Sequence, residues 1–205
     1  CKGEYGGTKS DCRVVLDGQN TINMAVRVYP RNYIRIEGFE IRNYTWDATV
    51  YIKPYAGIEV EGVEIVNTYI HDNTGDIYAR GGGTDVRNLL IENNDISNNI
   101  GDGILMGADG AIIRGNYIHD NGADGIVIGG NNIIVEKNHI CRFSGAPKHN
   151  DGISAGSLTN SIIRYNRVHD FTQNIYGGLL DVDYQEWVNV EIYGNIVYSE
   201  NYYYG

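Results

Sequence analysis

The chain of 205 residues has only three prolines, few basic side chains and no long hydrophobic run. Because no stretch of about 18 consecutive apolar residues occurs, the sequence predicts no transmembrane segment. No window shows a sustained amphipathic period of about 3.6 residues, which argues against long helices. What is abundant instead is glycine, with 27 residues, and tyrosine, with 17. This composition favours many short strands joined by tight turns.

Positive charge is also scarce. The chain carries 16 Lys and Arg against 26 Asp and Glu, which gives a formal net charge of −10 at pH 7. Nucleic-acid binding needs concentrated Lys and Arg, so this balance argues against a nucleic acid as partner. The acidity is compatible with neutral glycans, with calcium, or with solubility alone.

Cysteine is limited to three residues. Cys1 and Cys12 lie close together in sequence. Either they are joined by a disulfide, as is common in secreted proteins, or they are two unrelated free thiols. Cys141 is interpreted as a core residue. Since no Met begins the chain and no signal peptide precedes Cys1, we expect a processed or truncated product of a secreted or cell-surface protein.

A repeat of 22 to 29 residues runs along the chain. It is defined by seven aliphatic anchors, Ile41, Ile70, Ile96, Ile118, Ile140, Val168 and Val197. Such a period corresponds to one turn of a solenoid. Residues five and seven positions before each anchor are mostly aliphatic, so one face of a short strand points inward.

Two further columns support the repeat. Asparagine stands two positions before five anchors, at Asn94, Asn116, Asn138, Asn166 and Asn195. Because strands of neighbouring coils lie about 4.8 Å apart, stacked asparagines at one turn are expected to form a hydrogen-bonded ladder. A second strand of each coil is expected at the Asp-Gly-Ile sequences of residues 102–104, 124–126 and 151–153.

The segments at residues 33–43 and 116–121 resemble the repeats of the pectate-lyase-like right-handed parallel β-helix superfamily. The likeness covers about residues 13–200. It implies an all-β fold, a single-stranded right-handed parallel β-helix (solenoid) of about seven coils over residues 13–205. We expect residues 1–12 to form an N-terminal segment that could cap one end, and the helix to continue beyond the C-terminus or to stack there on a neighbour.

The resemblance does not choose one activity, because this superfamily includes lyases, glycoside hydrolases, epimerases, tailspikes, adhesins and structural proteins. The most enzyme-like stretch is residues 148–154, and its His-Asn-Asp-Gly-Ile sequence is similar to motifs of superfamily enzymes. The candidate catalytic residues are Lys148, His149, Asp151, Asp181 and Asp183.

Three interpretations of these residues remain open. Asp151 near Asp181 or Asp183 would supply the paired carboxylates of a glycoside hydrolase. The same carboxylates could bind calcium while Lys148 abstracts a sugar-ring proton in a polysaccharide lyase. Alternatively, Asp151 belongs to an Asp-Gly turn that opens a strand, as Asp102 and Asp124 do. The Asp-Asp, Gly-His-Gly and Arg-Ile-Lys sequences of the polygalacturonase branch are missing.

Aromatic and histidine side chains give weaker signals. Tyr117, Tyr184 and Trp187 are candidate carbohydrate-binding residues, because an exposed ring stacks on a sugar face. The same rings could pad loops or form subunit contacts. Histidines follow three anchors at positions 71, 119 and 169. We interpret them as turn residues, because their coils are not adjacent and about 10 Å or more should separate them. Metal ligands are left unassigned.

An outward row of aliphatic residues is the clearest surface feature. Six positions before four consecutive anchors stand Leu90, Ile112, Ile134 and Ile162. We call this row the apolar stripe. Beside it, Glu92, Arg114, Glu136 and Arg164 alternate in sign and should pair between neighbouring coils. The stripe is either an interface with another copy or a partner, or a surface covered by a loop or terminal segment.

Two functions are therefore expected to compete. The first is a secreted or surface β-helix that binds or processes polysaccharide, with calcium as the one cofactor to consider. The alternative is a structural filament, fibre or adhesin subunit that assembles through the apolar stripe and the coil ends. A catalytically silent sugar-binding module is a third hypothesis.

Overall fold

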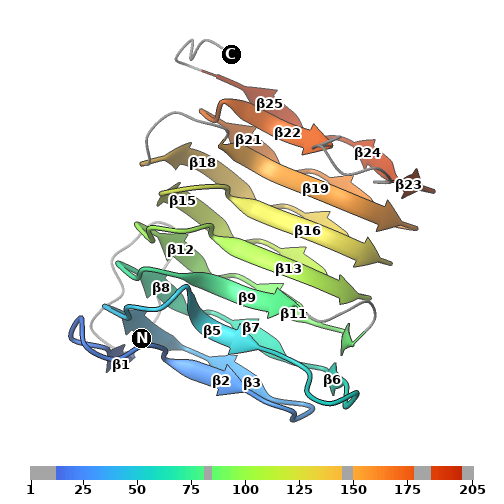
Figure 1. Ribbon diagram of the computed structural model, residues 1–205. Helices are drawn as coiled ribbons and strands as arrows, with labels where there is room; N and C mark the ends of the chain where they lie inside the picture. The colour runs from blue at the N-terminus through green and yellow to red at the C-terminus, as the bar shows by residue number, and fades with distance from the viewer. Residues whose placement is uncertain (1–12, 81–84, 145–149, 178–185, 200–205) are drawn as a thin grey trace.

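The computed structural model describes residues 13–80, 85–144, 150–177 and 186–199, and it confirms the parallel β-helix (Figure 1). The described residues form strands and no helix. None of them therefore builds a helix of the length and apolarity that crossing a bilayer requires. Residues 1–12, with Cys1 and Cys12, lie outside the described residues.

Three parallel sheets form the sides of the solenoid. Sheet A contains β1 (Val14–Asp17), β4 (Phe39–Arg42), β8 (Tyr69–His71), β12 (Asp95–Ser97), β15 (Tyr117–Asn121), β18 (His139–Phe143), β21 (Arg167–His169) and β25 (Ile196–Tyr198). Sheet C contains β3 (Arg35–Glu37), β7 (Glu64–Val66), β11 (Leu90–Glu92), β14 (Ile112–Arg114), β17 (Ile134–Glu136), β20 (Ile162–Arg164) and β24 (Glu191–Tyr193).

Sheet B has the longest strands. Its main path contains β2 (Val26–Val28), β5 (Ala48–Ile52), β9 (Asp76–Arg80), β13 (Ile104–Asp109), β16 (Ile126–Asn131), β19 (Asp151–Thr159) and β22 (Gln173–Gly177). At its side lie β6 (Val60–Glu61), β10 (Val86–Arg87) and β23 (Trp187–Val188). The chain passes from sheet C to sheet A to sheet B in each coil, so the seven strands of sheet C span six full turns.

The turn from sheet C to sheet A is the same in every coil. Three positions before each anchor the backbone has positive φ, at Gly38, Asn67, Asn93, Gly115, Lys137, Tyr165 and Gly194. Glycine and asparagine tolerate this left-handed conformation, which explains their frequency at the position. Two coils place Lys137 and Tyr165 there instead, at φ 55° and 57°.

The predicted asparagine ladder is present one position after this turn. The Asn116 amide Nδ2 donates to the Asn138 Oδ1 at 2.9 Å and to the Ile91 carbonyl at 3.0 Å. In return, the Asn116 Oδ1 accepts hydrogen bonds from the backbone and side chain of Asn94. Asn138, Asn166 and Asn195 continue the same pattern. A second ladder, which the sequence analysis did not predict, joins Asn73, Asn99 and Asn121 at the turn from sheet A to sheet B.

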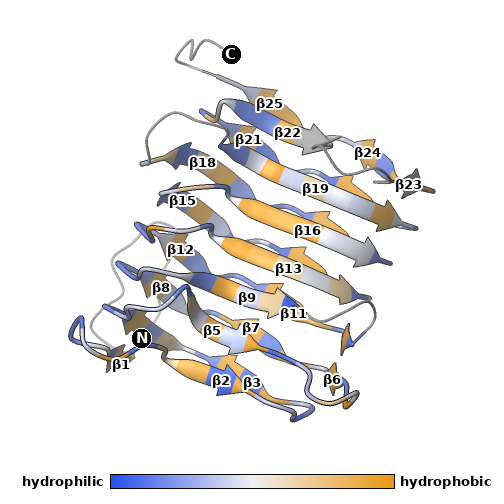
Figure 2. Cartoon of the chain, viewed as in Figure 1, coloured by the Kyte–Doolittle hydropathy of each residue, from blue (hydrophilic) through white to orange (hydrophobic). Residues whose placement is uncertain are grey.

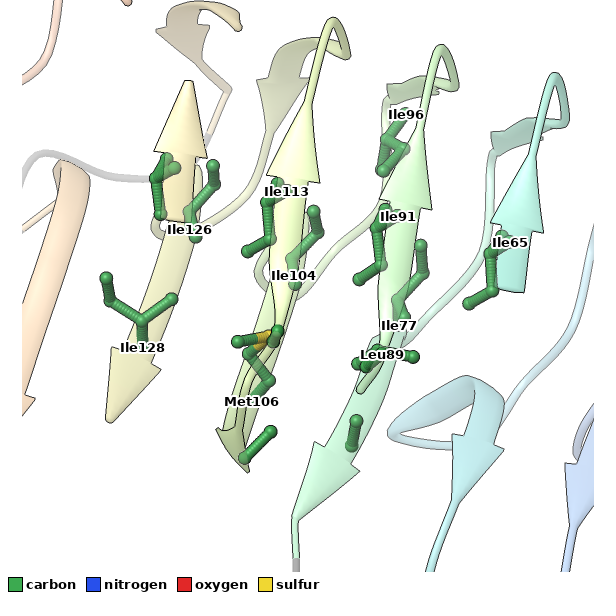
Figure 3. Close-up of a cluster of buried hydrophobic side chains, with 14 of the residues drawn as sticks. Ile65, Ile77, Leu89, Ile91, Ile96, Ile104, Met106, Ile113, Ile126 and Ile128 are labelled. Carbon is green, nitrogen blue, oxygen red and sulfur yellow. The ribbon is translucent and has the colours of Figure 1, made fainter. Parts of the chain in front are cut away.

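The core is a stack of aliphatic side chains inside the solenoid. Figure 3 shows isoleucines of successive coils lying one above another, such as Ile65, Ile91 and Ile113. All seven anchors lie in sheet A, and the six up to Val168 are fully buried. Figure 2 shows the hydrophobic residues concentrated on the strands and the hydrophilic ones at the turns. This burial follows directly from the period-two alternation of the sequence.

Candidate functional site

The outer face of sheet B combines aromatic rings with cations. On this face, which we call the sheet B face, Arg27, Tyr51 and Tyr78 are in register on β2, β5 and β9. The side chains on either side of them in sequence, such as Ile52 and Ile77, point into the core, so these three point outward. The rings of Tyr51 and Tyr78 lie 5.4 Å apart between centroids. Their planes are tilted by 30°, and together they form a small platform across two coils.

Basic side chains border this platform. The Lys53 ammonium lies 5.9 Å from the centre of the Tyr51 ring, within reach of a cation–π contact. Lys53 and Arg80 are both exposed, and both line an open pocket of about 380 Å³ together with Tyr55 and Tyr78. One carboxylate, Asp85, also lines the pocket. The local balance is thus cationic on a chain whose net charge is −10.

Two glycines continue the row of Arg80 on the sheet B face toward the C-terminal coils, between the outward side chains of Leu105 and Asp109 on β13 and of Val127 and Asn131 on β16. Arg80, Gly107 and Gly129 are in register on three neighbouring strands. A Cβ added at either glycine would make only ordinary contacts, 3.6 Å or longer, and neither residue has positive φ. Packing therefore does not demand glycine at these positions. Glycine inside a strand marks places where a ligand or another chain approaches the backbone closely.

The structure places only some of the predicted site residues. Lys148, His149, Asp181, Asp183 and Tyr184 lie outside the described residues. Asp151 opens β19, and its side chain is 1 % exposed. Its backbone N–H donates to the Asp124 Oδ1 at 2.8 Å, and the Asp124 N–H donates to the Asp102 Oδ1 at 2.9 Å. The three aspartates thus form one column, which we call the aspartate column, and Asp76 of the preceding coil lies beside it, one position out of register with Asp102.

Burial disfavours the ionised form of these carboxyl groups. It raises the pKa of Asp102 to about 6, with a smaller contribution from the neighbouring charge of Asp124. The pKa of Asp76 rises to about 8, because burial is assisted by the charges of Asp102 and Asp47. Raised pKa values of this kind are used by general acids, but they also occur in structural columns.

The two described aromatic candidates lie on different sheets. Trp187 is half-exposed beside sheet B, and its indole N–H donates to the Gly156 carbonyl at 2.8 Å. It therefore stands next to the coil that follows Gly129. Tyr117 lies on sheet A, where its ring stacks on His119 with 4.0 Å between centroids. The structure does not bring Tyr117 and Trp187 together.

Sheet A presents histidines, tyrosines and a thiol on its outer face. His139 and His169 lie on the adjacent strands β18 and β21, and their Nε2 atoms are 3.0 Å apart. Cys141 is in register with His169 and is fully buried. Its thiol lies outside the aliphatic core, however, 3.5 Å from a guanidinium nitrogen of Arg142. The interpretation of Cys141 as a buried residue is confirmed, and the structure adds that it is buried on the outer face of sheet A, beneath its polar neighbours, and not within the aliphatic cluster.

The environment of each ring on sheet A differs. Burial lowers the pKa of His139 to about 4, assisted by the positive charges of Arg167, His169 and Arg142, so this imidazole is neutral at pH 7. Burial also opposes the charge of His119, but its hydrogen bonds to Asp95 and Asp120 outweigh burial and raise its pKa. Burial raises the pKa of the Cys141 thiol against the pull of Arg142.

His139 was missed in the sequence analysis, which considered only the position after each anchor. In a strand, the residues before and after an inward anchor both point outward and share one face. His139 precedes Ile140, and His169 follows Val168 in the next coil. Considering both outward positions of adjacent coils would have found the pair.

The apolar stripe has the predicted register. Leu90, Ile112, Ile134 and Ile162 face one another on β11, β14, β17 and β20. Each is partly exposed. The charged row beside it pairs as expected, with Arg114 and Glu92 at 2.6 Å and Arg164 and Glu136 at 2.7 Å.

Comparison with known proteins places the fold but not the reaction. Residues 59–205 match the family described as right handed beta helix region. No curated protein matches the sequence significantly. The A-module of the mannuronan C-5 epimerase AlgE4 from Azotobacter vinelandii is similar in structure, with a TM-score of 0.50, 14 % identity, and coverage of 82 % of this chain and 53 % of that one.

A mutant of the periplasmic alginate epimerase AlgG gives a TM-score of 0.50 at 17 % identity, with coverage of 86 % of this chain and 49 % of that one. The chain thus spans about half the length of the solved structures it matches. At these identities the likeness establishes the β-helix architecture alone.

Proposed function

Because this chain belongs to the right-handed β-helix family, we propose that it binds an acidic polysaccharide on the sheet B face and processes it there. The observation that carries the proposal is the tyrosine platform bordered by cations. Tyr51 and Tyr78 offer neighbouring ring faces, and Lys53 and Arg80 lie at the edge of the same surface. Rings stack on sugar faces while the cations pair with the carboxylates of the polymer.

The shape of the surface supports a chain-like ligand. The platform is followed along the helix axis by Leu105 and Val127, which are in register with Tyr78, and the neighbouring row of Arg80 is followed by Gly107 and Gly129. A sugar chain along several coils would thus contact apolar side chains in one row and glycine backbone in the next, up to the coil that Trp187 contacts through Gly156. Mannuronan and alginate, for which the similar solved structures are named, are the first polymers to test.

The binding proposal is tested by calorimetric titration of the protein with alginate oligomers and with a neutral glucan. We expect binding of alginate that weakens as salt is added, because the cations are exposed and therefore screened. Tyr78→Ala and Arg80→Gln should each weaken it about five- to tenfold, because each removes a contact worth about 1 kcal/mol.

Tyr165→Ala and Lys137→Gln serve as matched controls, since both residues are exposed at the turn between sheets C and A. They should leave the affinity unchanged. Equal affinity for the neutral glucan, or equal losses in the control variants, would contradict binding of an acidic polymer at this face.

The proposal of catalysis rests on Asp151 together with Lys148, His149, Asp181 and Asp183. Asp151 opens a strand of sheet B, the sheet that carries the binding face, and its side chain is 1 % exposed, so a catalytic role requires that this carboxyl group becomes accessible to the polymer. Asp124 occupies the equivalent position one coil earlier, so Asp124→Asn is a matched control for Asp151→Asn. If the protein is an enzyme, product release from alginate should disappear in Asp151→Asn and persist in Asp124→Asn.

Equal losses in both variants would show that the aspartate column acts on stability and not on chemistry. Repeating the assay with calcium and with a chelator distinguishes a lyase that uses calcium from a metal-independent hydrolase. Binding of polysaccharide without any product would make the chain a sugar-binding module. In each of these cases we expect a secreted or cell-surface protein, because that is where such polymers are found.

A further inference from the structure

Three metal-ligating side chains converge on the outer face of sheet A, away from the sheet B face. The Nε2 or Nδ1 atoms of His139 and His169 and the Sγ of Cys141 all lie within 4.8 Å of one another. The three residues come from the adjacent strands β18 and β21, separated in sequence by almost a full coil. From this geometry we propose that His139, Cys141 and His169 bind a zinc ion that links the two coils.

The two imidazoles are already oriented toward a common point. His169 Nδ1 lies 2.7 Å from the Asp170 Oδ2, so its Nδ1–H donates to the carboxylate and its Nε2 lone pair faces His139. In zinc sites, a histidine ligand usually donates the N–H of its other ring nitrogen to a carboxylate. This hydrogen bond fixes the tautomer and raises the basicity of the ligand nitrogen. The His139 ring reaches the same point from the neighbouring strand, and it is partly exposed, which gives an ion a path from solvent.

The other described histidines are arranged differently. Both ring nitrogens of His119 contact carboxylates, Asp120 at 2.7 Å and Asp95 at 3.2 Å. His71 lies in the same way between Asp72 at 2.7 Å and Glu40 at 3.4 Å. Only the pair of His139 and His169 directs two imidazole nitrogens at each other among the described residues. Without an ion the His139 Nε2–H donates to the His169 Nε2 at 3.0 Å, and a cation that takes the place of this proton would bind both nitrogens.

The donor set selects the ion. Thiolate and imidazole favour zinc and exclude calcium and magnesium, which prefer oxygen ligands. On binding, the zinc accepts one lone pair from each imidazole and one from the Cys141 sulfur, while the thiol proton passes to solvent. His139 then carries its proton on Nδ1. Three protein ligands leave a fourth position for water.

The test is a titration of the metal-stripped full chain with Co²⁺, which reports thiolate coordination by its absorption bands, followed by displacement with Zn²⁺. The titration uses a Cys1→Ser, Cys12→Ser background, so that Cys141 is the only thiol present. We expect one equivalent of Co²⁺ with a thiolate charge-transfer band, and loss of this band on adding Zn²⁺. Zn²⁺ should also raise the melting temperature, because it binds the folded chain only.

Single replacements distinguish the loss of a metal ligand from the loss of the fold. Cys141→Ser should abolish the thiolate band, and His139→Gln, at a partly exposed position, should lower Zn²⁺ affinity at least about tenfold while the far-UV spectrum is kept. His71→Gln is the matched control and should leave binding unchanged. No thiolate band in the parent protein, an unchanged band in Cys141→Ser, or tight binding of Cu²⁺ with none of Zn²⁺ would each overturn the proposal.

Discussion

At the scale of single residues, the aspartate column shows how a solenoid concentrates like charges. Each coil that repeats an Asp-Gly turn adds a carboxyl group directly above the previous one, about 4.8 Å away. Asp102 and Asp124 accept a backbone N–H from the next coil, which favours their ionised form. Asp76 has an Oδ1 atom that is buried and accepts no hydrogen bond. Its ionised form is therefore costly.

The pH dependence of stability should report this cost. The pKa of Asp76 is raised to about 8 in the folded chain, above the value of 3.8 for a free side chain. The contribution of Asp76 to stability is therefore complete below about pH 4, and is lost as the pH rises toward 8. Asp76→Asn keeps the shape and cannot ionise. We expect its free energy of unfolding at pH 8 to exceed that of the parent by about 1 to 3 kcal/mol, so that it unfolds at a higher urea concentration. At pH 4 the two proteins should differ little.

The measurement is urea denaturation of both proteins from pH 4 to pH 8. Asp85→Asn removes a carboxylate of the same sheet outside the column and controls for the change in net charge. A gain in stability of Asp76→Asn that is the same at pH 4 and pH 8 would contradict a titration of this carboxyl group.

At the scale of the element, the asparagine ladder ties each coil to the next. The side chain of Asn116 takes part in four hydrogen bonds, with Asn94, Ile91 and Asn138, and Asn116 is 1 % exposed. Replacing it by alanine leaves the Asn94 N–H and the Ile91 carbonyl buried without these partners. We expect Asn116→Ala to lower the free energy of unfolding by about 2 to 4 kcal/mol, because each unpaired buried group costs about 1 to 3 kcal/mol.

Asn195 provides the comparison, since its side chain makes three of these four bonds, with Asn166 and Ile163, in the last described coil and is partly exposed. Water can replace the bonds lost in Asn195→Ala, so its effect should be clearly smaller in the same urea denaturation. Equal effects of the two replacements would show that burial does not set the strength of the ladder.

The sequence was sufficient to predict these elements because the repeat constrains them. An inward anchor such as Ile118 fixes which neighbours point out. Residues at the same distance before successive anchors then face each other in neighbouring coils, although the repeat length varies. The Asn94–Asn195 ladder and the apolar stripe followed from this rule alone. The ladder of Asn73, Asn99 and Asn121 stands three positions after Ile70, Ile96 and Ile118, and it was missed because this column holds asparagine in only three coils, while other coils place Phe143 or Phe171 there.

The site could be predicted less well, for a physical reason. Binding surfaces depend on which side chains lie together across coils, and on what covers them. The sheet B face combines Tyr51 and Tyr78 with Lys53 and Arg80, whose positions share no repeated motif. His139 and His169 occupy different positions relative to their anchors, so a search along a single column separates them. Lys148 and Asp181 lie outside the described residues.

At the scale of the whole molecule, the three sheets present three different outer faces. Sheet B offers rings and cations, and sheet A offers histidines, tyrosines and carboxylates. Sheet C carries the apolar stripe beside its row of paired charges. A polymer on sheet B and an ion on sheet A would leave the face of sheet C accessible. Binding and assembly are therefore compatible in one molecule.

The apolar stripe leads to a prediction for assembly. We expect the protein to form oligomers in solution, measured by light scattering, through Leu90, Ile112, Ile134 and Ile162. Ile112→Lys with Ile134→Lys would place two ammonium groups inside such an interface, where their desolvation is costly, and should yield monomers with an unchanged far-UV spectrum.

Ile100→Lys is the control, because Ile100 is 71 % exposed and lies outside the stripe. It adds the same charge to the surface and should leave the oligomer intact. Dissociation by both kinds of variant would indicate general charge repulsion, and a parent protein that is already monomeric would rule out the stripe as a self-interface. In that case the alternating Arg114 and Glu136 beside the stripe would have no partner chain to orient, and the structural alternative would lose its main support.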